Sequence, residues 1–411
     1  MRYVIIGNSY AGTSAVASIR EVDSKGEVVV ISSENYRAYS RPLISYFLAG
    51  RIRAADMYYR DRSFYSKNNV ELRLGEKVVG IDTKLKTVQL ERGEDIDYDR
   101  LLISTGGRPS LQKAAGIDAK NVFTFTTWND AKKLRETIRK KRKAVVLGGG
   151  LIGMKAAEGL KANGLDVSVV ISSPRVLSLI LDEASGKIMN RHLISSGIRL
   201  MTGHSVTEVH SGSGGEVSEV VLDTGKKIEC GIVVVAKGVR PNVEFIKDSG
   251  ISLNRGIIVD RQMKTNIGDV YSAGDSAEAW DLVNRRNSVI AIAPLACEQG
   301  RIAGYNMAGV NRMYNGGMSM NSIELSGLPL MAMGLSKGSE GMEVETFQKK
   351  GLYRKLVFSE DKLVGALLVG DVRYGGVLTH LIKSRSDISS IKGDLAGHYL
   401  KTGEFGFVSN K

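Results

Sequence analysis

The sequence predicts an α/β protein with two Rossmann-like domains. Two observations predict this class. Strand-like residues 4–6 and 144–147 each run into a glycine-rich turn, GNSYAG at 7–12 and GGGLIG at 148–153. The chain of 411 residues, 43% hydrophobic and 25% charged, has an ordinary globular composition. That length is enough for two or three domains, each with its own core.

Both turns have the form that accepts a dinucleotide. Glycines permit the tight turn from strand to helix, let the backbone approach a pyrophosphate, and leave the amides of the helix N-terminus facing it. The second turn fits G-x-G-x-x-G in full, whereas the first has Ser9 at the middle position. Two such turns predict two bound dinucleotides and a hydride that moves between them. The residues predicted to hold them are Gly7, Ser9, Ala11, Gly12, Gly148, Gly150, Leu151, Ile152 and Gly153.

Three further segments carry a resemblance to a known family. Residues 265–275, TNIGDVYSAGD, resemble the second flavin motif of FAD-dependent pyridine-nucleotide oxidoreductases. Residues 99–109 resemble the strand and turn by which the chain leaves the flavin domain in that family, and residues 235–242 resemble its return. The motifs stand in family order over nearly the whole chain. The sequence therefore resembles the pyridine nucleotide-disulphide oxidoreductase superfamily.

The resemblance implies a domain plan and a cofactor in each large domain. It implies a FAD-binding domain at 1–110 and 243–320, an inserted NAD(P)-binding domain at 111–242, and a small α+β interface domain at the C-terminal end, 321–411. It also implies that NADH or NADPH gives a hydride to flavin N5, with Asp275 accepting a hydrogen bond from the ribityl chain. The further residues expected at the cofactors are Glu34, Arg41, Pro42, Thr105, Gly106, Arg108, Gly238 and Gly274.

The two cysteines, Cys230 and Cys297, argue against disulfide chemistry. They form no C-x-x-C pair, through which the disulfide reductases of the superfamily pass electrons. In the single-cysteine oxidases the redox cysteine would fall near Pro42, which has no thiol. Cys230 is expected to be structural. Cys297, on a helix that faces the flavin in the family, is expected to be a core residue, and its redox activity stays open.

Residues 34–42 favour a particular acceptor. They resemble the Glu-x-x-x-x-Tyr-x-Arg-Pro stretch of rubredoxin reductases, ferredoxin reductases and the flavin part of nitrite reductases, which pass electrons singly to a metal centre. The resemblance implies that the acceptor is rubredoxin, ferredoxin or a partner iron–sulfur subunit. Three alternatives stay open: an NADH oxidase that uses oxygen, a flavin-binding module of the apoptosis-inducing-factor type, and, least favoured, a disulfide reductase working through Cys297.

Positive charge is concentrated before the second turn. The net charge is +13, and residues 132–143 carry the densest run of lysine and arginine. A solvated helix face explains such a run, and so does a docking surface for an acidic redox protein. Nothing resembles a base-reading element, so nucleic-acid binding is not expected.

Two positions depart from the pattern of the ferredoxin reductases. Those enzymes usually place a lysine near flavin N5 and pair it with a glutamate two residues past the second turn. The corresponding positions here are Tyr46 and Lys155. A cation near N5 would stabilise the anionic reduced flavin. We therefore predict that Lys155 acts as the catalytic cation; a solvent-facing lysine is the alternative.

The choice of nucleotide is left as NAD(P)H. An acid at the end of the second strand normally binds the adenosine ribose, and residues 167–171 run instead into Ser172, Ser173 and Arg175. These side chains could meet a 2′-phosphate, which favours NADPH. In the flavin domain Glu34 is the nearest acid for the ribose.

The remaining expectations concern location and ligands. The first strand begins at once and no apolar stretch spans a bilayer, so a cytoplasmic protein is expected. His380 and His398 have no metal-ligand spacing, and no metal site is expected. The sequence leaves open a homo-oligomer and a place in a larger complex.

Overall fold

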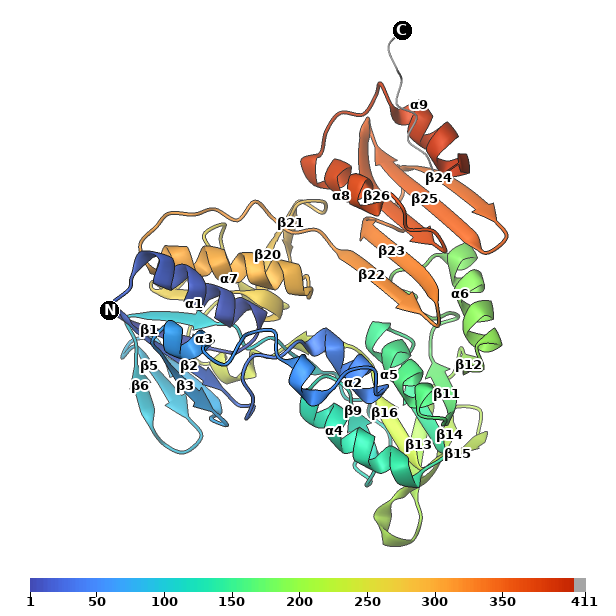
Figure 1. Ribbon diagram of the computed structural model, residues 1–411, viewed down its shortest axis with the longest axis horizontal. Coiled ribbons are helices and arrows are strands. Elements are labelled where there is room, and N and C mark those ends of the chain that lie inside the picture. Colours follow the sequence, from blue (N-terminus) through green and yellow to red (C-terminus); the bar gives the residue numbers. More distant parts are fainter. Residues whose placement is uncertain (403–411) are drawn as a thin grey trace. The chain divides into compact units, whose positions relative to one another are not determined.

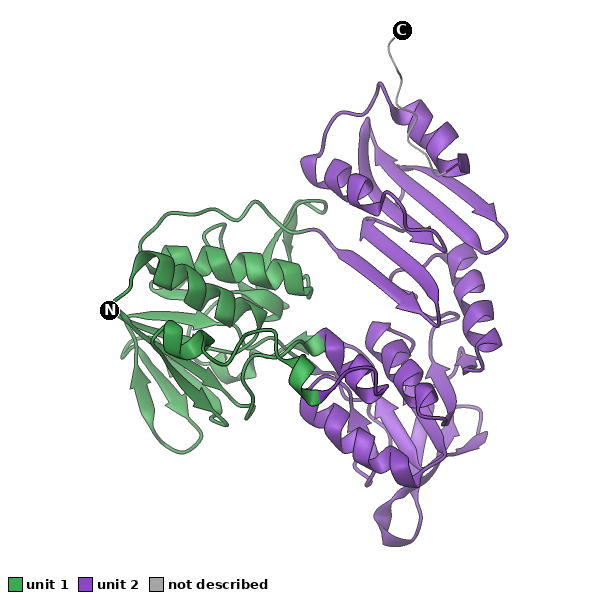
Figure 2. Ribbon diagram, in the orientation of Figure 1, with its two compact units in different colours: residues 1–41, 54–108, 239–317 green, residues 42–53, 109–238, 318–411 purple. Residues whose placement is uncertain are grey.

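The structure, a computed structural model, describes residues 1–402 (Figure 1). They divide into two compact units (Figure 2). Unit 1 comprises residues 1–41, 54–108 and 239–317. Unit 2 comprises residues 42–53 and 109–238 together with the chain from 318 onward. Each unit contains a five-stranded parallel sheet, and unit 2 contains a five-stranded antiparallel sheet as well. The α/β class predicted from the sequence is confirmed.

The parallel sheet of unit 1 has the strand order β19-β7-β1-β2-β3. Its central strand is almost wholly buried, as parallel strands covered on both faces must be. Its strands are β1 (Arg2–Ile6), β2 (Glu27–Ser32), β3 (Val70–Leu74), β7 (Arg100–Ile103) and β19 (Val270–Ser272). The other strands of the unit are β4 (Val78–Asp82), β5 (Thr87–Leu90), β6 (Asp95–Asp97), β8 (Gly107–Pro109), β17 (Val239–Pro241), β18 (Ile257–Ile258), β20 (Ala277–Asp281) and β21 (Arg286–Ser288).

Two helices of unit 1 cross closely on one another, α1 (Tyr10–Val22) and α7 (Ala293–Met307). Small residues allow the approach: a Cβ on Gly300 would lie 2.2 Å from the carbonyl oxygen of Ala11, and one on Gly304 would lie 2.6 Å from that of Ala15. The crossing holds the start of α1 in place above the carboxyl end of β1. The short helix α3 (Phe64–Lys67) completes the unit.

The parallel sheet of unit 2 has the order β12-β11-β10-β16-β9. Its strands are β9 (Val122–Thr124), β10 (Lys143–Leu147), β11 (Asp166–Ile171), β12 (Arg199–Thr202) and β16 (Ile232–Val235). The three-stranded sheet β13-β14-β15 (Val206–Ser211, Val217–Leu222, Lys227–Glu229) packs its apolar side chains into the same core. The helices are α4 (Trp128–Thr137), α5 (Leu151–Ala162) and α6 (Glu183–Ser195).

Residues 42–53, which the sequence assigns to the FAD-binding domain, pack in unit 2. They contain α2 (Ile44–Leu48), which contacts α4 and α5. The ring of Phe47 lies edge-on to that of Trp128, and the amide of Asn163 donates to the carbonyl oxygen of Leu48 at 2.8 Å. A Cβ on Gly159 would lie 2.8 Å from the side chain of Leu48. Glycine at 159 is therefore what lets α5 accept this helix.

The C-terminal sheet is antiparallel, with the order β22-β23-β26-β25-β24. Its elements are β22 (Met320–Leu325), β23 (Leu328–Gly334), β24 (Glu343–Lys349), β25 (Leu352–Ser359), β26 (Lys362–Val369) and α8 (Gly375–Ser384), followed by the helical segments α9 (Lys392–Asp394) and α10 (Leu400–Thr402), which a helical turn at Leu395–Tyr399 joins.

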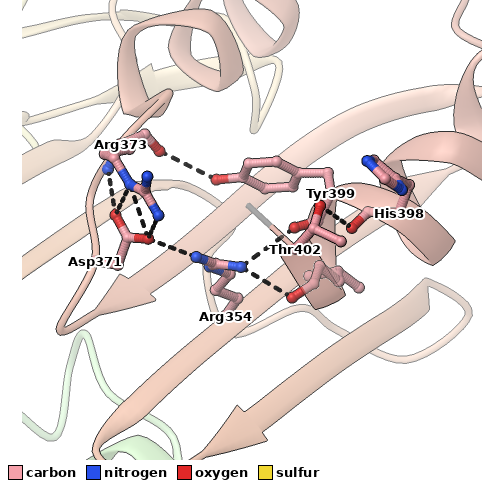
Figure 3. A network of polar contacts seen from close by, with 7 residues as sticks. Arg354, Asp371, Arg373, His398, Tyr399 and Thr402 are labelled. Carbon is pink, nitrogen blue, oxygen red and sulfur yellow. Dashed lines mark hydrogen bonds and ion pairs between the residues drawn. The ribbon is translucent and has the colours of Figure 1, made fainter. Parts of the chain in front are cut away.

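Buried Arg354 pins the last helical segments to this sheet (Figure 3). Its guanidinium donates to the carbonyl oxygens of Tyr399 and Leu400 and pairs with Asp371 at 2.5 Å. Arg373 pairs with the same carboxylate at 2.9 Å. Because one carboxylate joins two arginines, the pKa of Asp371 is held well below its usual range, first by Arg373 and then by Arg354.

Within residues 1–402, no helix is both long enough and apolar enough to cross a membrane.

Candidate dinucleotide-binding sites

The first glycine-rich turn joins β1 to α1, and its outer glycines are fixed by packing. Gly7 has φ +119°, and a Cβ there would lie 2.1 Å from the carbonyl oxygen of Ser104 on the neighbouring strand segment. A Cβ on Gly12 would lie 2.0 Å from the carbonyl oxygen of Gly7. Ser9 is the N-cap of α1, and its side chain makes no capping hydrogen bond. The first amides of α1 therefore receive no side-chain cap from Ser9.

The second turn repeats this construction between β10 and α5. Gly148 has φ +121°, and a Cβ there would lie 2.3 Å from the carbonyl oxygen of Ala236. A Cβ on Gly153 would lie 2.1 Å from the carbonyl oxygen of Gly148. Gly150 differs, because a Cβ on it would meet no heavy atom within 4 Å. Packing within the protein therefore does not require glycine at 150. The open space there would let a ligand approach the backbone of the turn. Leu151 and Ile152, half-buried, form the first turn of α5.

Asp275 in unit 1 offers a carboxylate without a donor. It follows Gly274, which has φ +77°, and within residues 1–402 no side-chain hydrogen bond to it is formed. Burial raises the pKa of Asp275, and the nearby Arg41 guanidinium opposes that rise. A desolvated carboxylate that lacks a donor fits the role predicted for it, the acceptor for a hydroxyl of FAD.

Glu34 and Arg41, both predicted at FAD, contact each other. The Arg41 guanidinium forms an ion pair with the Glu34 carboxylate, and the hydroxyl of Tyr39 donates to the same carboxylate at 2.7 Å. Glu34 is thus held by two protein groups, with 18% of its side chain exposed. Pro42, the next residue after Arg41, is exposed and falls in unit 2.

The segment by which the chain leaves unit 1 contacts the segment by which it returns. The residues involved on the leaving side are Thr105, Gly106 and Arg108. The hydroxyl of Thr105 donates to the carbonyl oxygen of Asn242 at 2.7 Å, and Arg108 forms an ion pair with Glu244. Gly106 has φ +67° and accepts from the amide of Asn242. Gly238, in unit 2, has φ +105° and open space around its Cβ position. Their contacts with FAD stay predictions.

Lys155 lies on α5, two residues beyond Gly153. Its ammonium donates to Glu158 at 2.7 Å and to the carbonyl oxygen of Glu324 at 2.5 Å. It also lies 5.8 Å from the centroid of the Tyr46 ring, so the structure brings together the two positions that depart from the reductase pattern. Glu158 further accepts from the amide of Ser326 at 2.5 Å. Lys155 therefore has a carboxylate partner, and its catalytic role stays a prediction.

The residues after β11 divide into an exposed and an anchored group. Ser172 is exposed, whereas Ser173 donates to the carbonyl oxygen of Arg175 at 2.8 Å. The Nε of Arg175 donates to the carbonyl oxygen of Leu181 at 3.0 Å, and its side chain packs where a Cβ on Gly186 would lie. This anchoring fixes the stem of Arg175 against α6, and a contact with a 2′-phosphate stays a prediction.

The cysteines remain apart and unpaired. Cys230 is buried, and that burial raises the pKa of its thiol to about 12. Cys297 is half-buried near the start of α7. In the described part of the chain, no three histidine, cysteine or acidic side chains are grouped as metal ligands.

Sequence reasoning gave no role to Lys237. This half-buried lysine follows the apolar strand β16 and stands beside the second glycine turn. A charged residue after five buried apolar residues, Ile232 to Ala236, was the available signal.

Two glycine turns on two parallel sheets, a helix start without a side-chain cap at each, and a five-stranded antiparallel C-terminal sheet are the features of a two-dinucleotide α/β oxidoreductase. Residues 1–300 match the family described as pyridine nucleotide-disulphide oxidoreductase, and residues 320–386 match the rubredoxin NAD+ reductase C-terminal domain. The chain belongs to the pyridine nucleotide-disulphide oxidoreductase family. It is an oxidoreductase that uses FAD and NADH or NADPH.

Individual relatives cover nearly the full chain. It is 31% identical to the NADH-dependent phenylglyoxylate dehydrogenase subunit epsilon of Aromatoleum evansii, over 98% of this chain and 96% of that one. It is also 31% identical to an NADH oxidase of Methanocaldococcus jannaschii, over 91% and 88%. The solved NADH:rubredoxin oxidoreductase of Clostridium acetobutylicum is 28% identical over 95% and 97%, with a TM-score of 0.80. The chain also matches the nitrite reductase [NAD(P)H] of Bacillus subtilis, and it spans 48% of the length of that protein.

Proposed function

We propose that the protein takes electrons from NAD(P)H and delivers them one at a time to a small iron protein of the rubredoxin or ferredoxin type, or to an iron–sulfur subunit of a larger complex. When bound, FAD supplies the exchange between a hydride donor and a one-electron acceptor. Two facts support the proposal together. The C-terminal residues match the rubredoxin NAD+ reductase C-terminal domain, and the two cysteines do not form a redox pair.

The chain's own residues bind and orient the two nucleotides. The amides at the start of α5, with Gly150 open above them, receive the pyrophosphate of NAD(P)H, and those at the start of α1 receive that of FAD. Asp275 accepts from a FAD hydroxyl, which places a donor on a carboxylate that otherwise lacks one. Little acid–base chemistry is asked of the protein, so few catalytic side chains are needed.

The exposed cations near α4 support an acidic partner. Lys141 and Lys143 are paired with Glu216 and Glu229. Arg139 and Arg142 are exposed in the same run, where they would steer an acidic protein by long-range attraction. A protein acceptor of this kind makes electron delivery sensitive to salt.

An anaerobic experiment tests the function. The FAD-loaded protein is titrated with NADH and, separately, with NADPH, while the flavin absorbance is followed. The reduced protein is then mixed with oxidised rubredoxin, with ferredoxin or with oxygenated buffer. We expect rapid bleaching by at least one nucleotide, fast reoxidation by an iron protein and slow reoxidation by oxygen. Slow bleaching by both nucleotides would contradict the proposal.

An NADH oxidase is the second candidate, favoured by the similarity to a protein of that name. It needs no partner, so oxygen alone would reoxidise the reduced protein as fast as NAD(P)H reduces it. The same mixing experiment separates the two functions.

A further inference from the structure

Lys237 stands at the edge of the sheet where the second glycine turn begins. Strand β16 pairs in parallel with β10, with Val235 opposite Leu147, and the amide of Ala236 donates to the carbonyl oxygen of Leu147 at 2.9 Å. Lys237 is the next residue. A Cβ on Gly148 would lie 3.5 Å from the backbone nitrogen of Lys237. The lysine therefore borders the first glycine of the turn.

The ammonium group of Lys237 lacks a counter-ion. It is half-buried, and among residues 1–402 it forms neither a hydrogen bond nor an ion pair with the protein. Burial lowers the pKa of Lys237, and no carboxylate opposes that fall. Lys155, the other lysine near this turn, already has Glu158 and the Glu324 carbonyl oxygen as partners. A partly desolvated cation without a partner is unfavourable by itself and becomes favourable when an anion reaches it.

The neighbouring turn is suited to receive that anion. Gly150 leaves open space over the start of α5, a helix of 12 residues whose first amides have no side-chain cap. These amides and the positive end of the helix dipole attract negative charge. The backbone of Lys237 lies at the same edge of the sheet, so its side chain can bring a positive charge to this turn. This combination matches a group with more than one negative charge, such as a diphosphate, better than it matches a neutral ring or sugar.

We infer that Lys237 binds the pyrophosphate of the nicotinamide nucleotide through its ammonium group, beside the amides of the second glycine turn. The inference rests on the proposed function, in which NAD(P)H occupies that turn. It assigns the charge on the nucleotide side to Lys237 in addition to Lys155. Because the contact is with the diphosphate, Lys237 contributes equally to binding of the oxidised nucleotide, the reduced nucleotide and a fragment without nicotinamide.

Calorimetric binding to the oxidised, FAD-loaded protein tests the inference without turnover. The ligands are NAD+, NADP+ and ADP-ribose, which keeps the diphosphate of NAD+ and lacks the nicotinamide. Lys237→Met keeps an unbranched side chain, one atom shorter, and removes its charge. We expect it to weaken NAD+ and ADP-ribose by a similar factor, about 10- to 100-fold, the loss typical of a charged hydrogen bond. Lys237→Arg is expected to keep most of the affinity.

Two controls keep the result interpretable. Lys226→Met removes an exposed lysine elsewhere in unit 2 and should leave every affinity unchanged. The FAD content and melting temperature of each variant show whether it has folded. If Lys237→Met fails to fold, the Lys237→Gln variant is measured in the same way.

Three outcomes would overturn the inference. Unchanged affinity of a folded, uncharged variant for ADP-ribose would show that Lys237 does not reach the diphosphate. Tighter binding of NAD+ with unchanged ADP-ribose would place the lysine at the cationic nicotinamide ring instead. A wild-type protein that binds none of the nucleotides, reduced or oxidised, would remove the proposed function along with the inference, whereas the first two outcomes leave that function standing.

Discussion

The two glycine turns share their outer construction and differ at the middle residue. At both turns the first glycine has a positive φ and faces a carbonyl oxygen on the next strand segment, and the last glycine faces the carbonyl oxygen of the first. At the middle position the first turn has Ser9 and the second has Gly150, over which the space is open. Packing therefore fixes the outer glycines, whereas it leaves the middle position of the second turn open, which supports the proposal that a ligand approaches the backbone there.

The largest expected effect comes from the outer glycines. Gly7→Ala and Gly148→Ala would each place a methyl group within 2.3 Å of a carbonyl oxygen at a φ near +120°. We expect each to lower the free energy of unfolding by more than about 3 kcal/mol. Gly7→Ala should abolish FAD retention. Thermal unfolding and the flavin absorbance of the purified protein measure these effects. A Gly148→Ala variant as stable as the wild type would contradict the conclusion that packing requires glycine at the outer positions of both turns.

A change outside both turns gives the comparison a reference. Arg354→Met leaves Asp371 with only Arg373, which is largely exposed, and frees two carbonyl oxygens (Figure 3). We expect a loss of about 3 kcal/mol in the free energy of unfolding, with no change in the affinity for NAD(P)H or FAD. Denaturant unfolding and nucleotide titration measure the two quantities. Weakened nucleotide binding would mean that the C-terminal sheet acts on the second turn.

The same network sets a pH dependence. Because the pKa of Asp371 is lowered in the folded protein, its contribution to stability is present above the ordinary aspartate pKa of about 4 and is lost as the pH falls through the folded value. In acid, the difference in stability between the wild type and Asp371→Asn should therefore shrink. Melting temperatures of both proteins from pH 7 down to pH 3 measure that difference; a difference that grows in acid would contradict the assignment.

Acids at the middle positions sharpen the comparison. Aspartate is a favoured N-cap residue, and the space at Gly150 admits it, so Gly150→Asp should fold normally. Its carboxylate would repel a pyrophosphate, and we expect about a 10- to 100-fold weaker affinity for NAD(P)H with FAD retained. Ser9→Asp should instead weaken the binding of FAD and leave the affinity for NAD(P)H unchanged. Gly150→Asn, neutral and of the same size, is the matched control in nucleotide titrations.

The smallest effect is expected at Lys155. Two residues past the last glycine, α5 has this lysine where α1 has buried Ser14. Glu158 already neutralises the charge of Lys155. We therefore expect Lys155→Met to lower the hydride-transfer rate only a few-fold and to lower the flavin potential slightly. Redox titration and stopped-flow reduction measure both. Values equal to those of the wild type would remove the predicted catalytic role.

Local sequence was sufficient where a feature depends on a turn and its two flanking elements. Gly7, Gly12, Gly148 and Gly153 could be found because a strand, a turn and a helix follow one another directly. The partners of Thr105 and Lys155 could not, because the carbonyl oxygens of Asn242 and Glu324 are distant in the chain. Glu158 was within reach, since a pair three residues apart on a helix lies on one face.

Residues 42–53 show a further limit. The domain plan that the family resemblance implies placed them in the FAD-binding domain, whereas α2 packs on α4 and α5, where Gly159 leaves room for Leu48. A tertiary contact of this kind has no periodicity to detect. The missing counter-ion of Lys237 is similar, because absence of a partner becomes visible only when all neighbours are placed.

Electron entry at the second glycine turn is tested most directly by the anaerobic reduction of bound FAD by NAD(P)H in Gly150→Asp, Gly150→Asn and the wild type. At a nucleotide concentration that saturates the other two proteins, we expect NAD(P)H to reduce Gly150→Asp much more slowly, and dithionite to reduce all three equally fast. Equal reduction of all three proteins by NAD(P)H would contradict the claim that electrons enter at the second glycine turn.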